Sequence, residues 1–428
     1  MKLEVYREYC GDYQRVGALS CEAGPTSFRY DPEYLSLQNA HAISNKLPLS
    51  DAPFSAEVTK AFFDGIVPEG SLRGDIARVA QVDRRDYLGV LNQVRNEPIG
   101  ALLFSDEQDI SQLRMDYEGL SPNKMHALAS APAREALEMT LESRISLAGA
   151  QSKVGLYHEG GNPNEGWYLP KGSAPSTHIV KACSDAFPGE TLCEALCMRA
   201  ARYMELTAEQ CFLIDAGTEN PLLAVERYDR FFDDDDARRV NGLRVPRRLH
   251  QEDVCQASGI SSALKYEPTE TNYLNLIATV IAERSADPLE DRFMLAYFQL
   301  FDYAMGNCDN HLKNWSILYS KEWATARLAP LYDVANTTMY PQLAREMGVS
   351  FGGSRVIDEV TVDMVLDRLS SIGVSKAMAR GMFADMRAEL VPALENAACS
   401  LSEEGFPQVK DVLDKLMPGV EQRLATLV

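Results

Sequence analysis

The segment GNCDNHLKNWSIL, residues 306–318, decides how the second half of the chain is interpreted. It follows an apolar run, MLAYFQLFDYAM, that is typical of a buried helix, and it leads into WSILYS, which is typical of a strand. A turn that only reverses the chain needs one or two polar residues. This segment carries four that could take part in chemistry, namely Asp309, His311, Lys313 and Asn314. Their crowding indicates a functional loop between a helix and a strand.

The spacing of the acidic and amide residues is typical of phosphoryl transfer. Asp309 and Asn314 are spaced as D-x-x-x-x-N, and Asp333 follows in LAPLYDVANTT after a gap of hairpin size. Magnesium prefers oxygen ligands and usually takes one or two carboxylates together with substrate phosphates, so Asn314 and Asp333 suit it. Asp309 would then be free to accept the proton of an attacking hydroxyl. The alternative, a loop whose Asp and Asn only cap helices, explains the crowding less well.

Residues upstream provide a candidate nucleotide site. Lys181 ends the apolar segment STHIVKA, where a strand would place it to neutralise phosphates, and Glu194 lies about one turn into the next predicted helix, placed to pair with it. The segment SLAGAQSK, residues 146–153, is a weak phosphate-loop candidate, since its small residues let backbone N–H groups approach an anion. An edge-strand lysine and an exposed helical glutamate remain the alternatives.

The order of the strand and helix patterns predicts the fold class. We expect an α+β protein with a two-lobed, protein-kinase-like fold, which has a small strand-rich lobe and a large helical lobe, preceded by an N-terminal α/β domain. The predicted segments are an N-terminal α/β domain (1–105), a connecting helical segment (106–143), a small kinase lobe with the phosphate loop (144–232) and a helical lobe with the catalytic loop (233–428). The charged stretch DDDDARRVNGLRVPRR is expected to be a solvated loop.

The composition is that of a folded and strongly acidic protein. The 428 residues are 46% hydrophobic and carry a formal net charge of −20, which argues against broad attraction to nucleic acid or anionic lipid. The start of the chain lacks the apolar stretch of a secretory signal, and no apolar run reaches the ~18 residues of a membrane span. We therefore expect a cytoplasmic protein without membrane contact.

The nine cysteines are scattered, which predicts reduced thiols. Cys193 and Cys197 lie four residues apart on a predicted helix. Because no histidine neighbours complete a zinc site, we expect them to be small core residues.

These motifs together resemble the HipA-type serine/threonine kinases, the toxin components of bacterial toxin–antitoxin pairs. The resemblance is carried by ISLAGAQSK, LPKGSAPSTHIVK, AVERYDRF, RLHQEDVCQASG, GNCDNHLKNWS and LAPLYDVA, which occur in the order of that family. In the N-terminal region it extends to VGALS, TSFRYDPEYL and LPLSDAPF, so it covers nearly the whole chain.

The resemblance implies ATP and Mg²⁺ as cofactors and a role for each matching position. Asp309 would be the catalytic base, Asn314 and Asp333 would hold magnesium, and Lys181 would contact the ATP phosphates. The phosphate loop would consist of Ala148, Gly149, Ala150, Gln151, Ser152 and Lys153. The hinge beside adenine would be Glu226, Arg227 and Tyr228. The rest of the ATP pocket would come from residues 311–314 and 332–335, with His311, Lys313, Tyr332 and Asp333 among them.

The resemblance also implies self-regulation at Ser146, which matches a serine that these kinases autophosphorylate. A phosphoserine adds nearly two negative charges, so beside a phosphate loop it would repel ATP and favour an expelled loop. Ser152, which stands where one well-known member of the family has an acidic residue, is a rival phosphorylation site. The bland alternative for Ser146 is a strand-end serine that bonds locally.

The implied partners are a small helix-turn-helix antitoxin and a protein substrate, for which an aminoacyl-tRNA synthetase is one candidate. The region that matches the family's DNA-contacting cluster, SFGGSRVIDEV, retains Arg355 but no run of lysines, so DNA would be contacted only through the antitoxin. Two alternatives stay open. The chain could be a catalytically quiet co-repressor or scaffold, or a kinase for a small molecule or lipid head group.

Overall fold

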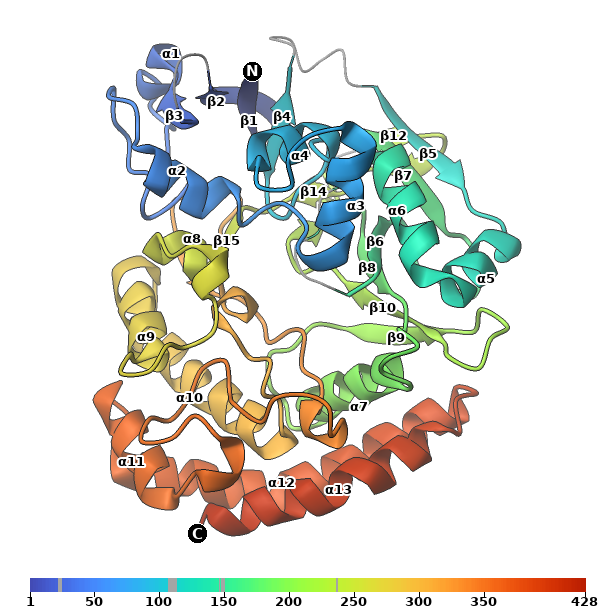
Figure 1. The fold of residues 1–428 in the computed structure, drawn as a ribbon, viewed down its shortest axis with the longest axis vertical. Helices are drawn as coiled ribbons and strands as arrows, with labels where there is room; N and C mark the ends of the chain where they lie inside the picture. Colours follow the sequence, from blue (N-terminus) through green and yellow to red (C-terminus); the bar gives the residue numbers. More distant parts are fainter. Residues whose placement is uncertain (22–24, 107–113, 146, 148–150, 236–237) are drawn as a thin grey trace. The chain divides into compact units, whose positions relative to one another are not determined.

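The computed structural model describes residues 1–21, 25–106, 114–145, 147, 151–235 and 238–428, which form two compact units (Figure 1). Unit 1 comprises Met1–Ser184, Ile214–Ser262 and Leu318–Ala326. Unit 2 comprises Asp185–Leu213, Ala263–Ile317 and Arg327–Val428. The units interleave along the chain, whereas the segments predicted from sequence are contiguous.

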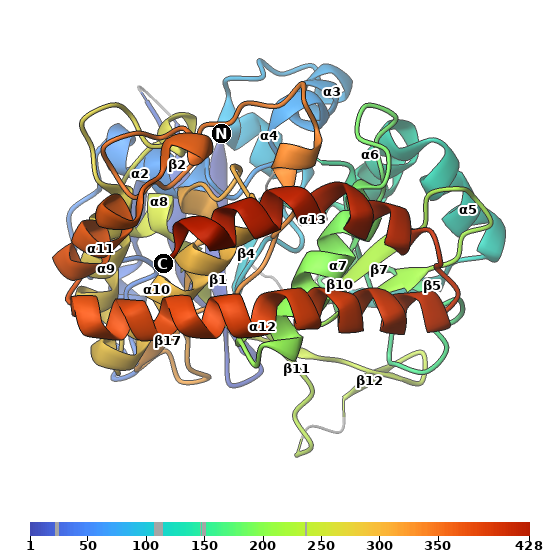
Figure 2. The same cartoon turned by 90° about the horizontal axis from the view of Figure 1, so that it is seen from below.

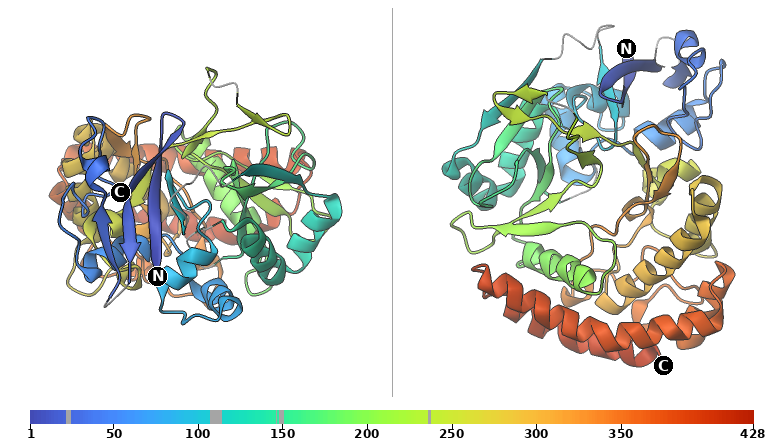
Figure 3. Two further views of the ribbon diagram at one scale, coloured as in Figure 1. Left: turned by 90° about the horizontal axis from the view of Figure 1, so that it is seen from above. Right: turned by 180° about the vertical axis from the view of Figure 1, so that it is seen from behind.

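The first sheet of unit 1 is built from the N-terminal strands (Figure 3, left). Its antiparallel order is β3-β2-β1-β4, with β1 Lys2–Tyr9, β2 Asp12–Ser20, β3 Ser27–Tyr30 and β4 Leu102–Ser105. Four helices follow β3 in sequence: α1 Pro32–Leu35, α2 Ala56–Phe63, α3 Gly70–Ala80 and α4 Tyr87–Gln93. The rings of Phe28, Phe63 and Phe104 meet in one core cluster, with centroids 5.3 Å and 6.0 Å apart around Phe63.

The second sheet of unit 1 contains β6 Lys153–Leu156, β8 His178–Lys181 and β10 Leu222–Glu226, with β8 paired antiparallel to both neighbours. Beside it β5 Met115–Gly119 pairs with β7 Tyr168–Gly172. The segment expected to be connecting and helical, 106–143, carries β5 and two helices. The chain forms α5 Pro122–Ser130 and α6 Pro132–Ser143, because the ring of Pro132 disfavours helical geometry at Ala131, which has φ −138° and ψ 61°.

The stretch expected to be a solvated loop contributes to the interior of unit 1. It contains the hairpin of β12 Arg239–Val240 with β13 Leu243–Arg244, and β14 Arg247–Arg248 pairs with β11 Arg230–Phe231. Arg248 is 4% exposed and lies 2.9 Å from the Glu8 carboxylate. The prediction failed here because the counter-charge that permits burial lies 240 residues away in the sequence. The strand β15 Gln251–Asp253 and the helix α8 Val254–Ser258 complete this part.

Unit 2 consists mainly of helices. They are α7 Glu190–Tyr203, α9 Tyr273–Arg284, α10 Pro288–Met305, α11 Val362–Ser371, α12 Lys376–Glu403 and α13 Val409–Thr426. The two long C-terminal helices, α12 and α13, lie side by side (Figure 2). Figure 3 (right) shows α10 next to α9, with which it packs. Strands β9 Cys211–Ile214, β16 Ser316–Tyr319 and β17 Ala326–Leu328 each carry residues of both units. Short 3-10 turns lie at Ser262–Leu264, Leu312–Asn314, Thr337–Met339 and Ile357–Glu359.

The mixture of sheets and helices confirms the expected α+β class. Cys193 and Cys197 of α7 are fully buried, as predicted for small core residues. Within the described ranges, no helix combines the length and the apolar character that a membrane crossing requires.

Candidate active site

The segment 306–318 adopts the predicted order of helix, loop and strand. Helix α10 ends at Met305, the turn Leu312–Asn314 follows, and β16 begins at Ser316. Gly306 ends the helix with φ +78°, and its N–H bonds to the carbonyls of the last helical turn. A Cβ atom at this position would lie 2.6 Å from side-chain atoms of Arg423 and Thr338, so a larger residue would strain the backbone and displace both side chains.

Buried amides hold the backbone of this loop. Asn307 donates to Asp302 of α10 at 2.7 Å and accepts the Asp309 N–H at 3.0 Å. Asn310 accepts the Val349 N–H at 3.1 Å and donates to Gln299 of α10 at 3.2 Å. Because these partners are buried, the loop cannot shift without leaving polar groups unsatisfied.

The side chain of Asp309 points out of this rigid loop and is exposed. The side-chain amide of Asn314 donates to the backbone carbonyl of Asp309 at 3.0 Å. This bond orients the amide and leaves the Asn314 Oδ1 atom as a ligand for a cation. One oxygen of the Asp309 carboxylate, Oδ1, accepts a hydrogen bond from the Tyr266 hydroxyl at 2.5 Å.

Asp333 lies in a segment tied to the same loop. Tyr332 bonds to the Ser316 hydroxyl and to the Lys313 carbonyl, both at 2.7 Å. Asp333 itself has φ +59°, a left-handed conformation that is uncommon for a residue with a side chain. Such strain persists where surrounding contacts enforce it, and it is common at functional sites.

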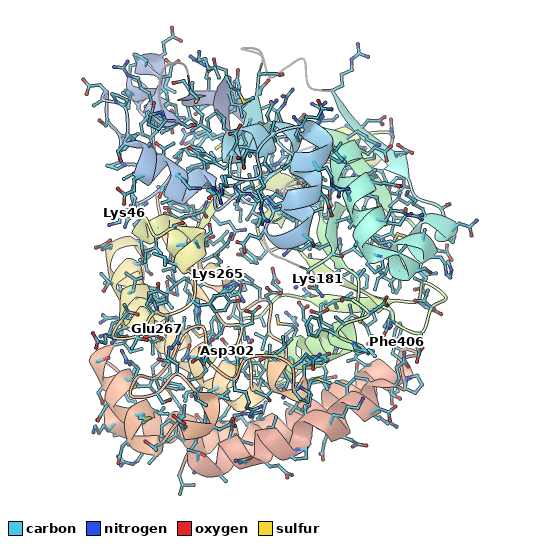
Figure 4. All side chains as sticks on the ribbon, viewed as in Figure 1. Lys46, Lys181, Lys265, Glu267, Asp302 and Phe406 are labelled. Atoms are coloured by element: carbon cyan, nitrogen blue, oxygen red, sulfur yellow. The ribbon has the colours of Figure 1, made fainter. Side chains whose placement is uncertain are left out.

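Two buried groups at the catalytic loop, Asp302 and His311, have shifted pKa values. Burial raises the pKa of Asp302 to about 7, and the charge of Asp333 acts in the same direction. Burial lowers the pKa of His311 to about 4, so its ring is neutral at neutral pH. The charge of Asp333 acts on both groups. Figure 4 labels Asp302 on α10.

In unit 1, Lys181 and Lys153 are direct partners across the β8–β6 pair. Strand β8 lies between β6 and β10, and Lys181 is only 5% exposed, which excludes the edge-strand alternative (Figure 4). The register places the two lysines on the same face of the sheet. Lysine ammonium groups are suited to binding the phosphates of a nucleotide.

The predicted hinge follows β10. Glu226 is exposed, while the Arg227 guanidinium is buried and makes two 2.9 Å bonds to Asp229. Burial opposes ionisation of Asp229, but Arg227 and Arg230 lower its pKa. Tyr228 donates its hydroxyl to Gln251. The Arg227 side chain is thus part of a buried ion pair inside unit 1.

The remaining predicted residues divide into two groups. Ser146, Ala148, Gly149 and Ala150 lie outside the described residues. Gln151 and Ser152 are half-buried, and the Ser152 carbonyl accepts the Ala182 N–H at 3.0 Å. Glu194 is 3% exposed on α7 of unit 2, so it is not an ordinary surface glutamate. No group of three or more His, Cys, Asp or Glu within the described ranges is arranged to hold a metal.

Sequence reasoning missed Asp302 and Tyr266. Asp302 had a signal, since it is the one charged residue in the apolar run before Gly306. Tyr266 had none, because it lies 43 residues from Asp309. Arg355, noted for its place in a possible DNA-contacting region, bonds to the Glu267 carbonyl and forms a 3.0 Å ion pair with Glu346.

Comparison with known proteins places the chain in the HipA family. Residues 145–394 match the model of the HipA-like C-terminal domain, and residues 9–105 match that of the HipA N-terminal domain. Y4mE of Sinorhizobium fredii, a provisionally named kinase, is 33% identical over 79% of this chain and 79% of its own length. The serine/threonine-protein kinase toxin HipA of Shewanella oneidensis is 23% identical over 78% of this chain and 76% of its own.

The fold gives the same result. The structure of Shewanella oneidensis HipA, solved with HipB and operator DNA, matches 99% of this chain and 96% of its own, with a TM-score of 0.78 and 18% identity. The expected kinase-like α+β fold is confirmed.

Proposed function

The chain belongs to the HipA family, and from this membership we propose that it is an ATP- and Mg²⁺-dependent serine/threonine protein kinase that acts as a growth-arresting toxin. One observation carries the proposal. Asp309 is exposed on a loop whose backbone is held by buried amides, and the Asn314 side chain is bonded directly to it. A base that is fixed in place but accessible to solvent is what transfer to an external hydroxyl requires.

The roles follow from the donor types. Asp309 accepts the proton of the acceptor hydroxyl as the γ-phosphoryl group of ATP is transferred. The Asn314 amide oxygen and the Asp333 carboxylate are hard oxygen donors that fit Mg²⁺, and the metal would neutralise charge on the phosphates. In unit 1, Lys153 and Lys181 would attract the phosphates, and by family the loop from Ala148 to Lys153 and the hinge Glu226–Tyr228 would contact the nucleotide. In unit 2, the nucleotide contacts proposed by family are His311, Lys313 and Tyr332.

The proposed regulation and partners of the chain rest on its membership of the HipA family. Self-phosphorylation at Ser146, or at the rival Ser152, would add negative charge beside the phosphate loop and stop ATP binding. The protein substrate would be a component of translation, such as an aminoacyl-tRNA synthetase. A helix-turn-helix antitoxin would neutralise the kinase and supply the DNA contacts. Support for this partner comes from the solved relative, whose structure contains HipA, HipB and operator DNA.

The test is mass spectrometry of the intact chain and its peptides after incubation with Mg-ATP. We expect added phosphate on Ser146 or Ser152, and none when Asp309 is replaced by alanine. Asp363→Ala serves as the control, because Asp363 is a helix-start aspartate on α11 that plays no part in the catalytic loop. An Asp309→Ala variant that keeps full activity would overturn the assignment.

The second candidate is a catalytically quiet co-repressor, which the DNA-bound assembly of the solved relative favours. Protein free of phosphate that binds ATP but gains none in the same experiment would support this candidate over the kinase.

A further inference from the structure

Residues 265–267 run alongside the catalytic loop. Lys265 is bonded to the loop directly, and Glu267 is bonded to it through Gly348. The Lys265 carbonyl accepts the Leu312 N–H at 3.0 Å. The Glu267 N–H donates to the Gly348 carbonyl, and the Gly348 N–H donates to the Cys308 carbonyl, both at 2.9 Å. Tyr266, between them, is therefore held beside Asp309 by backbone bonds. Figure 4 labels Lys265 and Glu267 in this part of unit 2.

The Glu267 carboxylate anchors the same segment from its inner side. Glu267 is 2% exposed and accepts the Ser350 N–H at 2.6 Å and the Tyr273 N–H at 3.3 Å. Arg355 binds the Glu267 carbonyl in addition. A segment with this many buried bonds is part of the framework of the unit, so the position of Tyr266 is set before any substrate arrives.

The Tyr266 side chain has a specific geometry although it is 45% exposed. Its hydroxyl donates to Asp309 Oδ1 at 2.5 Å. Its ring meets the His311 ring edge to face, with centroids 5.2 Å apart and an interplanar angle of 81°. The Lys265 ammonium lies 5.4 Å from the centroid of the same ring. These contacts orient the side chain toward Asp309.

We infer that Tyr266 is the positioning residue of the catalytic base, holding Asp309 Oδ1 so that Oδ2 faces the acceptor hydroxyl. The inference rests on the proposed function, which makes Asp309 the base. The proton of the acceptor hydroxyl passes to Oδ2, while the tyrosine keeps its own proton. An exposed aspartate without this bond populates several rotamers, and a displaced base transfers protons less efficiently.

The test is the rate of self-phosphorylation with labelled Mg-ATP, measured over a range of ATP concentrations. Tyr266→Phe keeps the ring against His311 and removes only the hydroxyl. We expect the maximal rate to fall about tenfold, a fraction of the 10²–10⁴-fold that a general base contributes, with KM for ATP within about twofold of the wild type. Tyr266→Ala is expected to show the same loss, because the hydroxyl is the group that acts.

The matched control is Tyr297→Phe, which removes another exposed tyrosine–aspartate bond of unit 2, the 2.8 Å contact with Asp385. It is expected to react at the wild-type rate. A Tyr266→Phe variant that is as fast as the wild type, while Asp309→Asn is inactive, overturns the inference and leaves the proposed function intact. A changed KM with an unchanged maximal rate overturns it as well. Full activity of Asp309→Asn, or no transfer by the wild type, overturns the proposed function and the inference with it.

Discussion

Asn314 and Asp309 are joined directly, because the Asn314 side-chain amide donates to the Asp309 backbone carbonyl at 3.0 Å. A hydrogen bond therefore links the two ends of the D-x-x-x-x-N motif. A change at Asn314 affects both the proposed metal ligand and the backbone of the proposed base.

Replacing Asn314 by alanine removes the amide oxygen and the bond to Asp309. We expect the phosphotransfer rate to fall at least about 100-fold and the half-saturating Mg²⁺ concentration to rise about tenfold or more. Asn314→Asp restores an oxygen ligand but places a carboxylate against the Asp309 carbonyl, so it should recover magnesium affinity better than rate. A magnesium titration of the initial rate checks both variants. If the rate of Asn314→Ala depends on magnesium concentration as that of the wild type does, Asn314 is not a magnesium ligand.

Lys181→Ala should weaken nucleotide binding, because it removes one charge of the opposed pair Lys153 and Lys181. Charge-assisted bonds contribute about 1.5–3 kcal/mol, so the Kd for ATP should rise about 10- to 100-fold. Isothermal titration calorimetry measures this directly. Lys171→Ala on β7 is the control, since Lys171 already pairs with Glu142 at 2.5 Å and with Glu118 at 3.0 Å. Equal ATP affinities for wild type and Lys181→Ala would contradict the assignment.

Glu97→Ala should destabilise unit 1 strongly. The Glu97 carboxylate is fully buried and lies 3.1 Å from Arg230, 3.6 Å from Arg227 and 3.9 Å from Arg248. Removing one partner of a buried ionic cluster leaves uncompensated charge and costs about 3–5 kcal/mol. Urea denaturation should show this loss, whereas Glu138→Ala, at a glutamate whose side chain is 57% exposed, should cost under about 1 kcal/mol. If Glu97→Ala loses as little unfolding free energy as Glu138→Ala, the remaining arginines are not left with uncompensated charge and the prediction is wrong.

His178 should make unit 1 sensitive to acid. Burial lowers its pKa to about 3, with nearby His158 adding to the shift, whereas an unfolded histidine titrates near ~6.5. The unfolded state therefore binds the extra proton between pH 6.5 and 3, and the contribution to stability is present above ~6.5 and lost as pH falls. Between pH 7 and pH 5 this loss is about 2 kcal/mol.

The comparison variant is His178→Gln, which cannot titrate in this range. Denaturation at pH 7 and pH 5 should show the free energy of unfolding of the wild type falling about 2 kcal/mol further than that of the variant. Parallel changes in the two proteins would mean that His178 is protonated in the folded state.

Local features of the site were predictable from sequence. Helix, loop and strand around 306–318 follow from a switch in apolar periodicity, and both the strand that ends at Lys181 and the helix that carries Glu194 were expected. The break between α5 and α6 was also predictable from the sequence, because Pro132 marks it.

Contacts between distant residues were not predictable. Tyr266 is hydrogen-bonded to Asp309, which lies 43 residues away in sequence, and Arg248 is hydrogen-bonded to Glu8, which lies 240 residues away. No single sequence indicates which tyrosine approaches a base, or which arginine finds a buried carboxylate.

By itself, the sequence determined the types and spacing of the chemical groups, from Asp309 and Asn314 to Asp333, since these depend on neighbouring positions along the chain. Only the tertiary structure decided how they are held. Buried amides fix the loop, Tyr332 ties Asp333 to it, and Lys153 faces Lys181 across a strand pair. The physical reason is that packing and the satisfaction of buried polar groups select these contacts among elements far apart in sequence.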